Sequence, residues 1–233
     1  MAVRIITDST SDLSCDLQEQ LGIEIVPLTV RFGSEDYLDG VTLSREQFYE
    51  RLKGCAELPT TAQVNPETFV RVFEKYDAAD EIIGIFISGE LSGTYQSAVI
   101  AKELVGRDNI HLIDSRTVTF ALGLLVKEAV RLLALLLAWL LARGQLEAAA
   151  ALGLSWWQTQ RRVVLPQALA AVLPGLIGRM RFYAMLDTLK YLKMGGRLSA
   201  SSALLGTMLR IKPIITVKNG LVEVCGKKQG QRA

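Results

Sequence analysis

Short apolar runs alternate with amphipathic segments through the first half of this chain. Residues 3–7 (VRIIT) and 110–113 (IHLI) are two such runs, and residues 81–88 (EIIGIFIS) form a nearly continuous one. Apolar runs of this length are typical of strands in a sheet that is covered on both faces. Because segments with helical spacing separate them, the order predicts an α/β fold with a mostly parallel sheet and right-handed crossovers.

Capping signals indicate where the helices begin. Ser44-Arg45-Glu46-Gln47 has the spacing of a capping box, and Asn65-Pro66 puts a capping residue before a proline in the first helical turn. Other helices are expected between the cap Ser14 and Gly22, after Ser92, and from about Thr119.

Further strands are expected on both sides of this core pattern. Residues 23–32 are rich in branched side chains and predict one long strand. Residues 211–217 and 221–224 predict a hairpin, because the Asn219-Gly220 pair between them is a strong turn signal. Residues 204–210 are expected to be helical.

Polar residues follow the expected strands at four places, and ligands of parallel sheets bind at the carboxyl ends of the strands. Backbone N–H groups at helix starts favour anions, and Ser or Thr hydroxyls add neutral hydrogen bonds. Helix capping would explain any one cluster, but four clusters at one edge favour a site for a carboxylate or a phosphate. The clusters are Asp8-Ser9-Thr10, Thr61 within residues 59–63, Ser92-Gly93-Thr94 and Asp114-Ser115.

Composition limits the chemistry. The net charge is +2, so no nucleic-acid partner is expected. His111 is the one histidine, and Cys15, Cys55 and Cys225 are far apart. We therefore expect no ordinary zinc site, no Ser/His/Asp hydrolase site and no cofactor, and reduced thiols in a cytoplasmic protein.

The middle of the chain has a different composition. Residues 132–178 carry four charged side chains and all three tryptophans. Its uncharged runs are too short for a transmembrane helix. A buried helical hairpin is the first interpretation, and peripheral contact with a membrane is the second.

The flanking parts resemble the DegV family of bacterial lipid-binding proteins. The resemblance covers residues 1–131 and about 180–232, and it rests on the order and spacing of several short motifs. It implies a parallel-sheet N-terminal domain (1–131), a helical segment (132–179) and a truncated second α/β domain (180–233), since family members continue beyond the position of Ala233. The motifs are ITDSTSD (6–12), PTTAQ (59–63), LSGTY (91–95), DS (114–115), LKYL (189–192), GGRLS (195–199) and IKPI (211–214).

The resemblance also implies a function. A long-chain fatty acid would lie between the two domains, with its carboxylate held by Thr61, Ser92 and Gly93. A fatty acid kinase would be the partner that phosphorylates the carboxylate, so the carrier would not be an enzyme. The supporting pocket would consist of Asp8, Ser9, Thr10, Thr94 and Arg197.

Residues 138–178 resemble a different family. Glu147-Ala148-Ala149, Gly153, Val163 and Leu165-Pro166 match the spacing of the EAA motif of ABC-transporter permeases. In those permeases the motif docks on an ATPase subunit. The chain is therefore interpreted as a chimera with a permease-like insert.

Two other functions remain open at this point. An interaction module would dock on an ATPase or a membrane surface through the permease-like hairpin. A phosphotransferase would use a cluster of carboxylates, for which Asp8, Asp12 and Asp114 are the candidates.

Overall fold

The computed structural model describes residues 2–55, 57–142, 165–186 and 211–229. The apolar runs form a four-stranded parallel sheet in the order β2-β1-β6-β7, which confirms the expected fold class. All six residues of β6 are buried, as the EIIGIFIS run predicted. The strands are β1 (Val3–Asp8), β2 (Ile23–Val26), β6 (Glu81–Phe86) and β7 (Ile110–Asp114).

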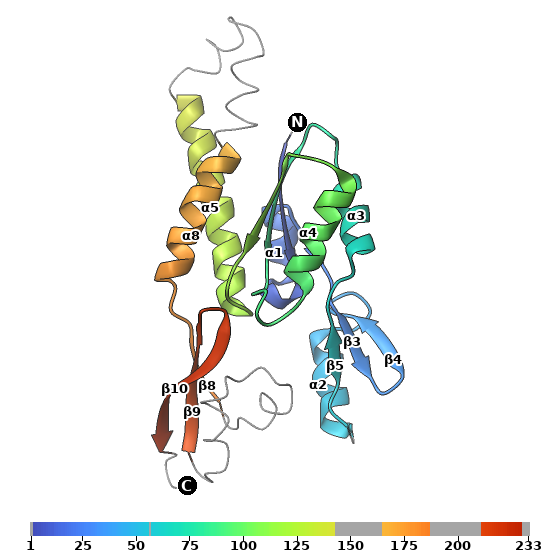
Figure 1. Cartoon of the computed structure of the whole chain (residues 1–233). Coiled ribbons are helices and arrows are strands. Elements are labelled where there is room, and N and C mark those ends of the chain that lie inside the picture. The colour runs from blue at the N-terminus through green and yellow to red at the C-terminus, as the bar shows by residue number, and fades with distance from the viewer. Residues whose placement is uncertain (1, 56, 143–164, 187–210, 230–233) are drawn as a thin grey trace, which may run out of the picture.

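Helices cover both faces of the parallel sheet (Figure 1). Leu122 and Leu125 of α5 and Leu173 of α8 pack on one face, and Phe69 and Phe73 of α3 with Ala98 of α4 pack on the other. The caps predicted at Ser14, Ser44 and Asn65 are present, and Gly22 ends α1 in a left-handed conformation. The helices are η1 (Ser9–Ser11), α1 (Cys15–Leu21), α2 (Arg45–Gly54), α3 (Pro66–Glu74), α4 (Thr94–Val105), α5 (Phe120–Ala142) and α8 (Leu165–Arg179).

The single strand expected over residues 23–32 is wrong. The chain leaves the parallel sheet at Val26, and β3 (Thr29–Phe32) pairs in an antiparallel sheet with β4 (Glu35–Leu38) and β5 (Thr60–Ala62). Pro27 lies at the break, where a residue without an N–H cannot donate to a ladder. The short strands β4 and β5 were not predicted, because they are largely exposed and lack an alternating apolar pattern.

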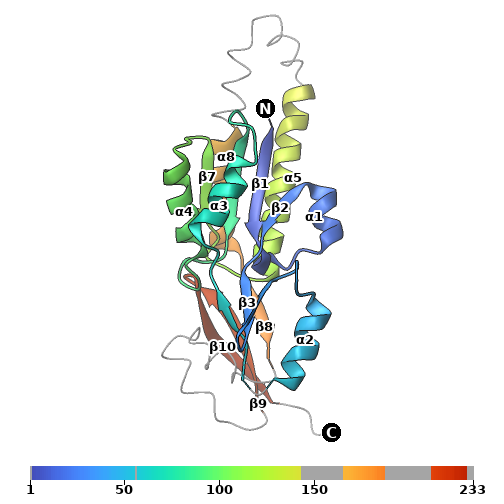
Figure 2. The same ribbon diagram turned by 90° about the vertical axis from the view of Figure 1, so that its right-hand side faces the viewer.

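A third sheet contains the expected hairpin. β9 (Ile211–Lys218) and β10 (Leu221–Gln229) pair in antiparallel fashion around Asn219 and Gly220, which both have positive φ angles. β8 (Tyr183–Met185) adds to its edge. Figures 1 and 2 show this sheet and the β3–β5 sheet at the same end of the parallel sheet, which is the carboxyl end of its strands.

Part of the apolar middle segment belongs to the main core. α5 runs continuously past residue 131, where a domain boundary was expected, and Leu173 of α8 is fully buried among core residues. Within the described residues, no helix is both long enough and apolar enough to cross a membrane. Most of the EAA-like motif lies in residues 143–164, outside the described part of the chain.

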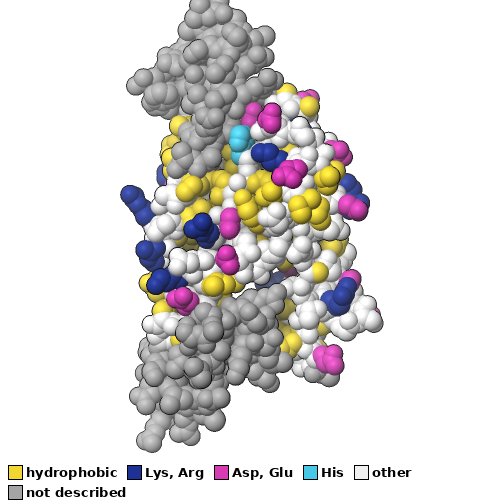
Figure 3. Space-filling view, viewed as in Figure 1, with side chains coloured by type: hydrophobic (Ala, Val, Ile, Leu, Met, Phe, Trp, Pro, Cys, Tyr) yellow, Lys and Arg dark blue, Asp and Glu magenta, His cyan; other side chains and the backbone are white. Residues whose placement is uncertain are grey.

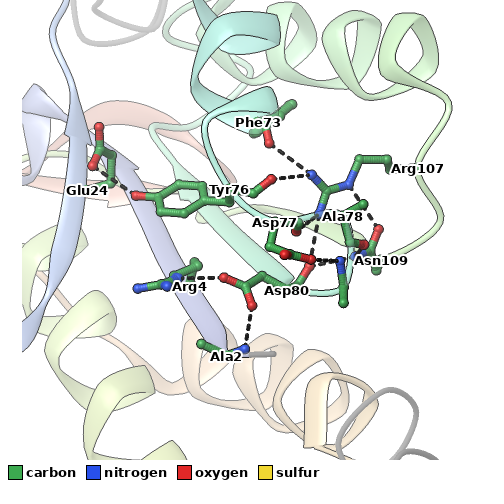
Figure 4. A network of polar contacts seen from close by, with 11 residues as sticks. Ala2, Arg4, Glu24, Phe73, Tyr76, Asp77, Ala78, Asp80, Arg107 and Asn109 are labelled. Atoms are coloured by element: carbon green, nitrogen blue, oxygen red, sulfur yellow. Dashed lines mark hydrogen bonds and ion pairs between the residues drawn. The ribbon is translucent and has the colours of Figure 1, made fainter.

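Arg107 makes a network of hydrogen bonds at the amino ends of β6 and β7 (Figure 4). Its guanidinium donates to the carbonyl oxygens of Phe73, Tyr76, Asp77 and Asp80 at 2.9–3.2 Å, and to Asn109 Oδ1 at 3.2 Å. The Phe73 carbonyl lies in the last turn of α3, where carbonyls have no partner within the helix, and the other three lie in the turn that follows. The planar guanidinium of Arg107 therefore caps the C-terminus of α3 and stabilises the turn that leads into β6.

Because this network needs a planar fork of donors, Arg107→Lys is expected to destabilise the fold despite its retained charge. A lysine can satisfy only part of the carbonyl set, so the free energy of unfolding should fall by about 2 kcal/mol. Urea denaturation measures the change. Arg45→Lys is a matched control, since Arg45 makes one exposed ion pair with Asp12, and a similar loss in both variants would contradict the assignment.

Candidate functional site

Ser92 lies in a tight loop between β6 and α4. Its backbone N–H donates to the carbonyl oxygen of Ser88 at 3.1 Å, and its Oγ lies 3.0 Å from Thr94 Oγ1. Gly93 is the N-cap of α4 and provides no side-chain cap. The hydroxyl of Ser92 therefore stands at a helix start with a glycine cap, an arrangement that suits an anionic oxygen.

Thr61 comes from a different sheet than expected. It lies in the middle of β5, opposite Val30 of β3, and its side chain is exposed. The structure nevertheless joins its segment to the Ser92 loop, because the Val64 N–H donates to Thr94 Oγ1 at 3.4 Å. Thr61 is three residues from Val64, and Ser92 is two residues from Thr94. This one hydrogen bond therefore connects the segments that carry Thr61 and Ser92.

Gln63 makes a second connection between the two segments. Its Nε2 donates to Ser97 Oγ at 3.1 Å, and its side chain crosses directly over Gly93. A Cβ atom at residue 93 would lie 1.9 Å from Gln63 Oε1. A side chain at residue 93 would displace the end of the Gln63 side chain, so glycine at this position leaves room for the Gln63–Ser97 hydrogen bond.

Asp8, Ser9 and Thr10 support the carboxyl edge of the sheet from within. Asp8 is fully buried and accepts hydrogen bonds from Thr10 and, at 2.7 Å, from the Ile87 N–H. Ser9 Oγ accepts from the Leu28 N–H at 3.1 Å, which fixes the passage from β2 to β3. These side chains are engaged in holding strand ends and loops together.

Burial raises the pKa of the Asp8 carboxyl above its ordinary value of 3.8, and the hydrogen bonds from Thr10 and Ile87 offset only part of this shift. Because the folded pKa is the higher one, the stability that Asp8 contributes is fully present below 3.8 and is lost as the pH rises through the folded value. Relative to Asp8→Asn, the wild-type protein should therefore lose stability as the pH is raised from about 4 upward. Urea denaturation of both proteins across this range checks the sign, and a constant difference would contradict it.

A cleft of about 880 Å³ lies beside this region, between the carboxyl end of β7, the end of α8 and the β8–β10 sheet. Its wall includes Asp114, Ile113 and Ile177 from the parallel-sheet domain and Val217 and Asn219 from the hairpin. Thr61 and Ser92 do not line it. Asp114 nevertheless borders the Ser92 loop, because its Oδ1 accepts from the Gly89 N–H at 3.2 Å.

The remaining predicted residues separate into three groups. Arg197 lies outside the described residues. Of the carboxylates considered for a phosphotransferase, Asp12 forms an ion pair with Arg45 and Asp8 is fully buried. The described residues contain no cluster of three metal-ligating side chains. His111 lies in β7, and its Nε2 is 3.0 Å from Glu81 Oε2. All three cysteines have free thiols.

Charges of both signs share the face shown in Figure 3. Lys, Arg, Asp and Glu side chains alternate there with hydrophobic ones over its described part. Ile100 and Leu104 of α4 are among the exposed hydrophobic residues.

Two family models match the chain. The model described as "Uncharacterised protein, DegV family COG1307" matches residues 2–135 and 166–233. The model described as "Binding-protein-dependent transport system inner membrane component" matches residues 118–184.

Curated proteins and solved structures show the same similarity. A DegV domain-containing protein of Caldanaerobacter subterraneus subsp. tengcongensis is 36% identical over 99% of this chain and 72% of its own length. A structure described as fatty acid binding of a DegV family protein from Thermus thermophilus has 34% identity and a TM-score of 0.73, covering 99% of this chain and 72% of that one. A fatty acid (stearic acid)-binding protein from Eubacterium ventriosum has 30% identity and a TM-score of 0.77, covering 98% and 71%.

Proposed function

Since the chain belongs to the DegV family, we propose that it binds a long-chain fatty acid and holds the carboxylate between Thr61, Ser92 and Gly93. Relatives in this family are described as fatty-acid-binding proteins and not as enzymes. The observation that carries the assignment is the joining of the two hydroxyl-bearing segments through Val64 and Thr94.

The chemistry of these groups suits a carboxylate. Two hydroxyls and the N-terminus of a twelve-residue helix offer hydrogen-bond donors and a favourable dipole without a nucleophile and its base. Asp8 is enclosed below the edge, which keeps its own carboxyl away from the ligand. Such a site holds an acyl head group and leaves it chemically unchanged.

The acyl chain is proposed to lie between the parallel-sheet domain and the β8–β10 sheet. The cleft there presents apolar side chains from both sides, including Ile113, Ile177 and Val217. Each methylene buried in it would stabilise the complex by about 0.8 kcal/mol. A chain of many methylenes therefore provides most of the affinity, and the hydroxyls select the head group.

A kinase partner follows from the same proposal. A carrier that exposes the head group at a sheet edge, while burying the tail, can present the carboxylate to an enzyme that phosphorylates it. A fatty acid kinase is therefore the proposed partner.

Head-group selectivity tests the proposal. Protein freed of lipid is titrated with stearic acid and with stearyl alcohol, which share the tail and differ in the anion. The acid is expected to bind at least about tenfold more tightly, because the hydroxyls and the helix start interact with charge. Equal affinities would contradict the carboxylate site.

The match of residues 118–184 to the transporter model favours a second candidate, in which the permease-like insert docks on an ATPase or a membrane surface. The core position of Leu173 weighs against a freely protruding hairpin over the whole segment. Replacing residues 143–164 by a short linker tests this candidate. It predicts that co-sedimentation with anionic liposomes, or capture of an ATPase, is lost while fatty acid binding remains.

A further inference from the structure

The tip of the β9–β10 hairpin touches the loop that carries Ser92, although 132 residues separate the two contacting groups in the chain. Ser88 is fully buried, and its Oγ donates to the Gly220 carbonyl oxygen at 2.9 Å. Gly220 is also buried, with a φ angle of +82°. The contact is close, since a Cβ atom at residue 220 would lie 2.4 Å from Ser88 Oγ.

Ser88 connects this contact to the loop that carries Ser92 through its carbonyl oxygen and its Oγ, while its N–H anchors it to the start of the segment after β7. Its N–H donates to the Thr117 carbonyl at 2.9 Å, and its carbonyl oxygen accepts from the N–H groups of Leu91 and Ser92 at 3.0 and 3.1 Å. Its Oγ also accepts from the Glu90 N–H at 3.3 Å. A shift of Ser88 would therefore move the backbone of Ser92.

Leu91 adds a packing contact at the same place. It lies against the core of the parallel sheet and also against Ile215 and Val222, the buried pair of the hairpin sheet. The residue next to Ser92 is thus held by both domains. Because the hairpin tip also lines the cleft through Asn219, one element borders the proposed acyl tail and steadies the proposed head-group loop.

We propose that Ser88 and Gly220 are positioning residues, through which the C-terminal hairpin sets the position of Ser92 and so the preference for a carboxylate head group. The inference rests on the proposed function. It adds that the second domain contributes to recognition of the head group as well as to the acyl cleft.

The test compares stearic acid with stearyl alcohol on Ser88→Ala and Gly220→Ala, with Gly226→Ala as the control. At residue 226 of the same hairpin, a Cβ atom would meet only Ile214 at an ordinary distance of 3.6 Å. Ser88→Ala is expected to weaken acid binding about fivefold while alcohol binding stays within about twofold. Gly220→Ala should reduce the preference further, because it adds backbone strain to the clash, whereas Gly226→Ala should keep the wild-type preference.

The outcomes separate the two proposals. If wild-type protein shows no preference for the acid, the proposed function fails and this inference falls with it. If wild-type protein prefers the acid, the inference alone is overturned by either of two results with a folded Ser88→Ala or Gly220→Ala variant. One is an unchanged preference, and the other is an equal loss of affinity for acid and alcohol, as a merely structural defect would give.

Discussion

The double variant Thr61→Ala, Ser92→Ala is expected to bind a long-chain fatty acid at least about 100-fold more weakly than the wild-type protein. Each hydroxyl would donate a hydrogen bond to a charged carboxylate, and such bonds contribute about 1.5–3 kcal/mol each. The fold should tolerate the change, since Thr61 is exposed and, within the described part of the chain, the hydrogen bonds of Ser92 Oγ are local ones to Thr94, two residues further on.

Thr60→Ala is the matched control for this variant. Thr60 precedes Thr61 in β5 and is also exposed. Its side chain points to the opposite face of the strand. Its replacement should leave fatty acid binding unchanged. Titration of lipid-free protein with stearic acid measures both, and wild-type affinity in the double variant would show that the carboxylate is held elsewhere.

Phe69→Ala is expected to lower the free energy of unfolding by about 3–5 kcal/mol. Phe69 is fully buried on α3, with ring centroids 5.0 Å from Phe86 of β6 and 5.9 Å from Phe73. Removing it opens a cavity between the helix and the parallel sheet. Phe69→Ala should also affect the segment that carries Thr61 and Val64, because α3 begins at Pro66, directly after that segment.

Phe120→Ala provides the comparison on an exposed ring. Phe120 begins α5 and keeps 63% of its surface exposed, so its loss should change the free energy of unfolding by less than about 0.5 kcal/mol. Urea denaturation of the two variants gives the difference. Similar values for both would mean that the assigned core face of α3 is wrong.

The parallel-sheet domain could be predicted from the sequence because its signals are local. The EIIGIFIS run, the capping box at Ser44 and the Asn65-Pro66 start each specify their own element. The exit of the chain at Pro27 was missed, since β-branched residues continue on both sides of it. β5 was missed because three exposed residues carry no periodicity, and its sheet depends on pairing with β3.

The candidate site could be predicted only as a set of residue types. Strand-end hydroxyls at Ser92 and Thr61 were visible as motifs, whereas the Val64–Thr94 hydrogen bond that joins their segments depends on tertiary structure. The Asn-Gly pair predicted a turn, but nothing local indicates that Gly220 contacts Ser88. The sequence-predicted Asp8 proved to be a buried support, because hydroxyl and carboxyl groups at strand ends serve capping and binding equally well.

Extraction of the purified, denatured protein with organic solvent, followed by mass spectrometry of the extract, examines the proposed function without any added ligand. We expect a long-chain fatty acid in an amount close to equimolar with the wild-type chain, and its loss from the Thr61→Ala, Ser92→Ala variant. An empty extract from folded wild-type protein, or an equal yield from the double variant, would contradict it.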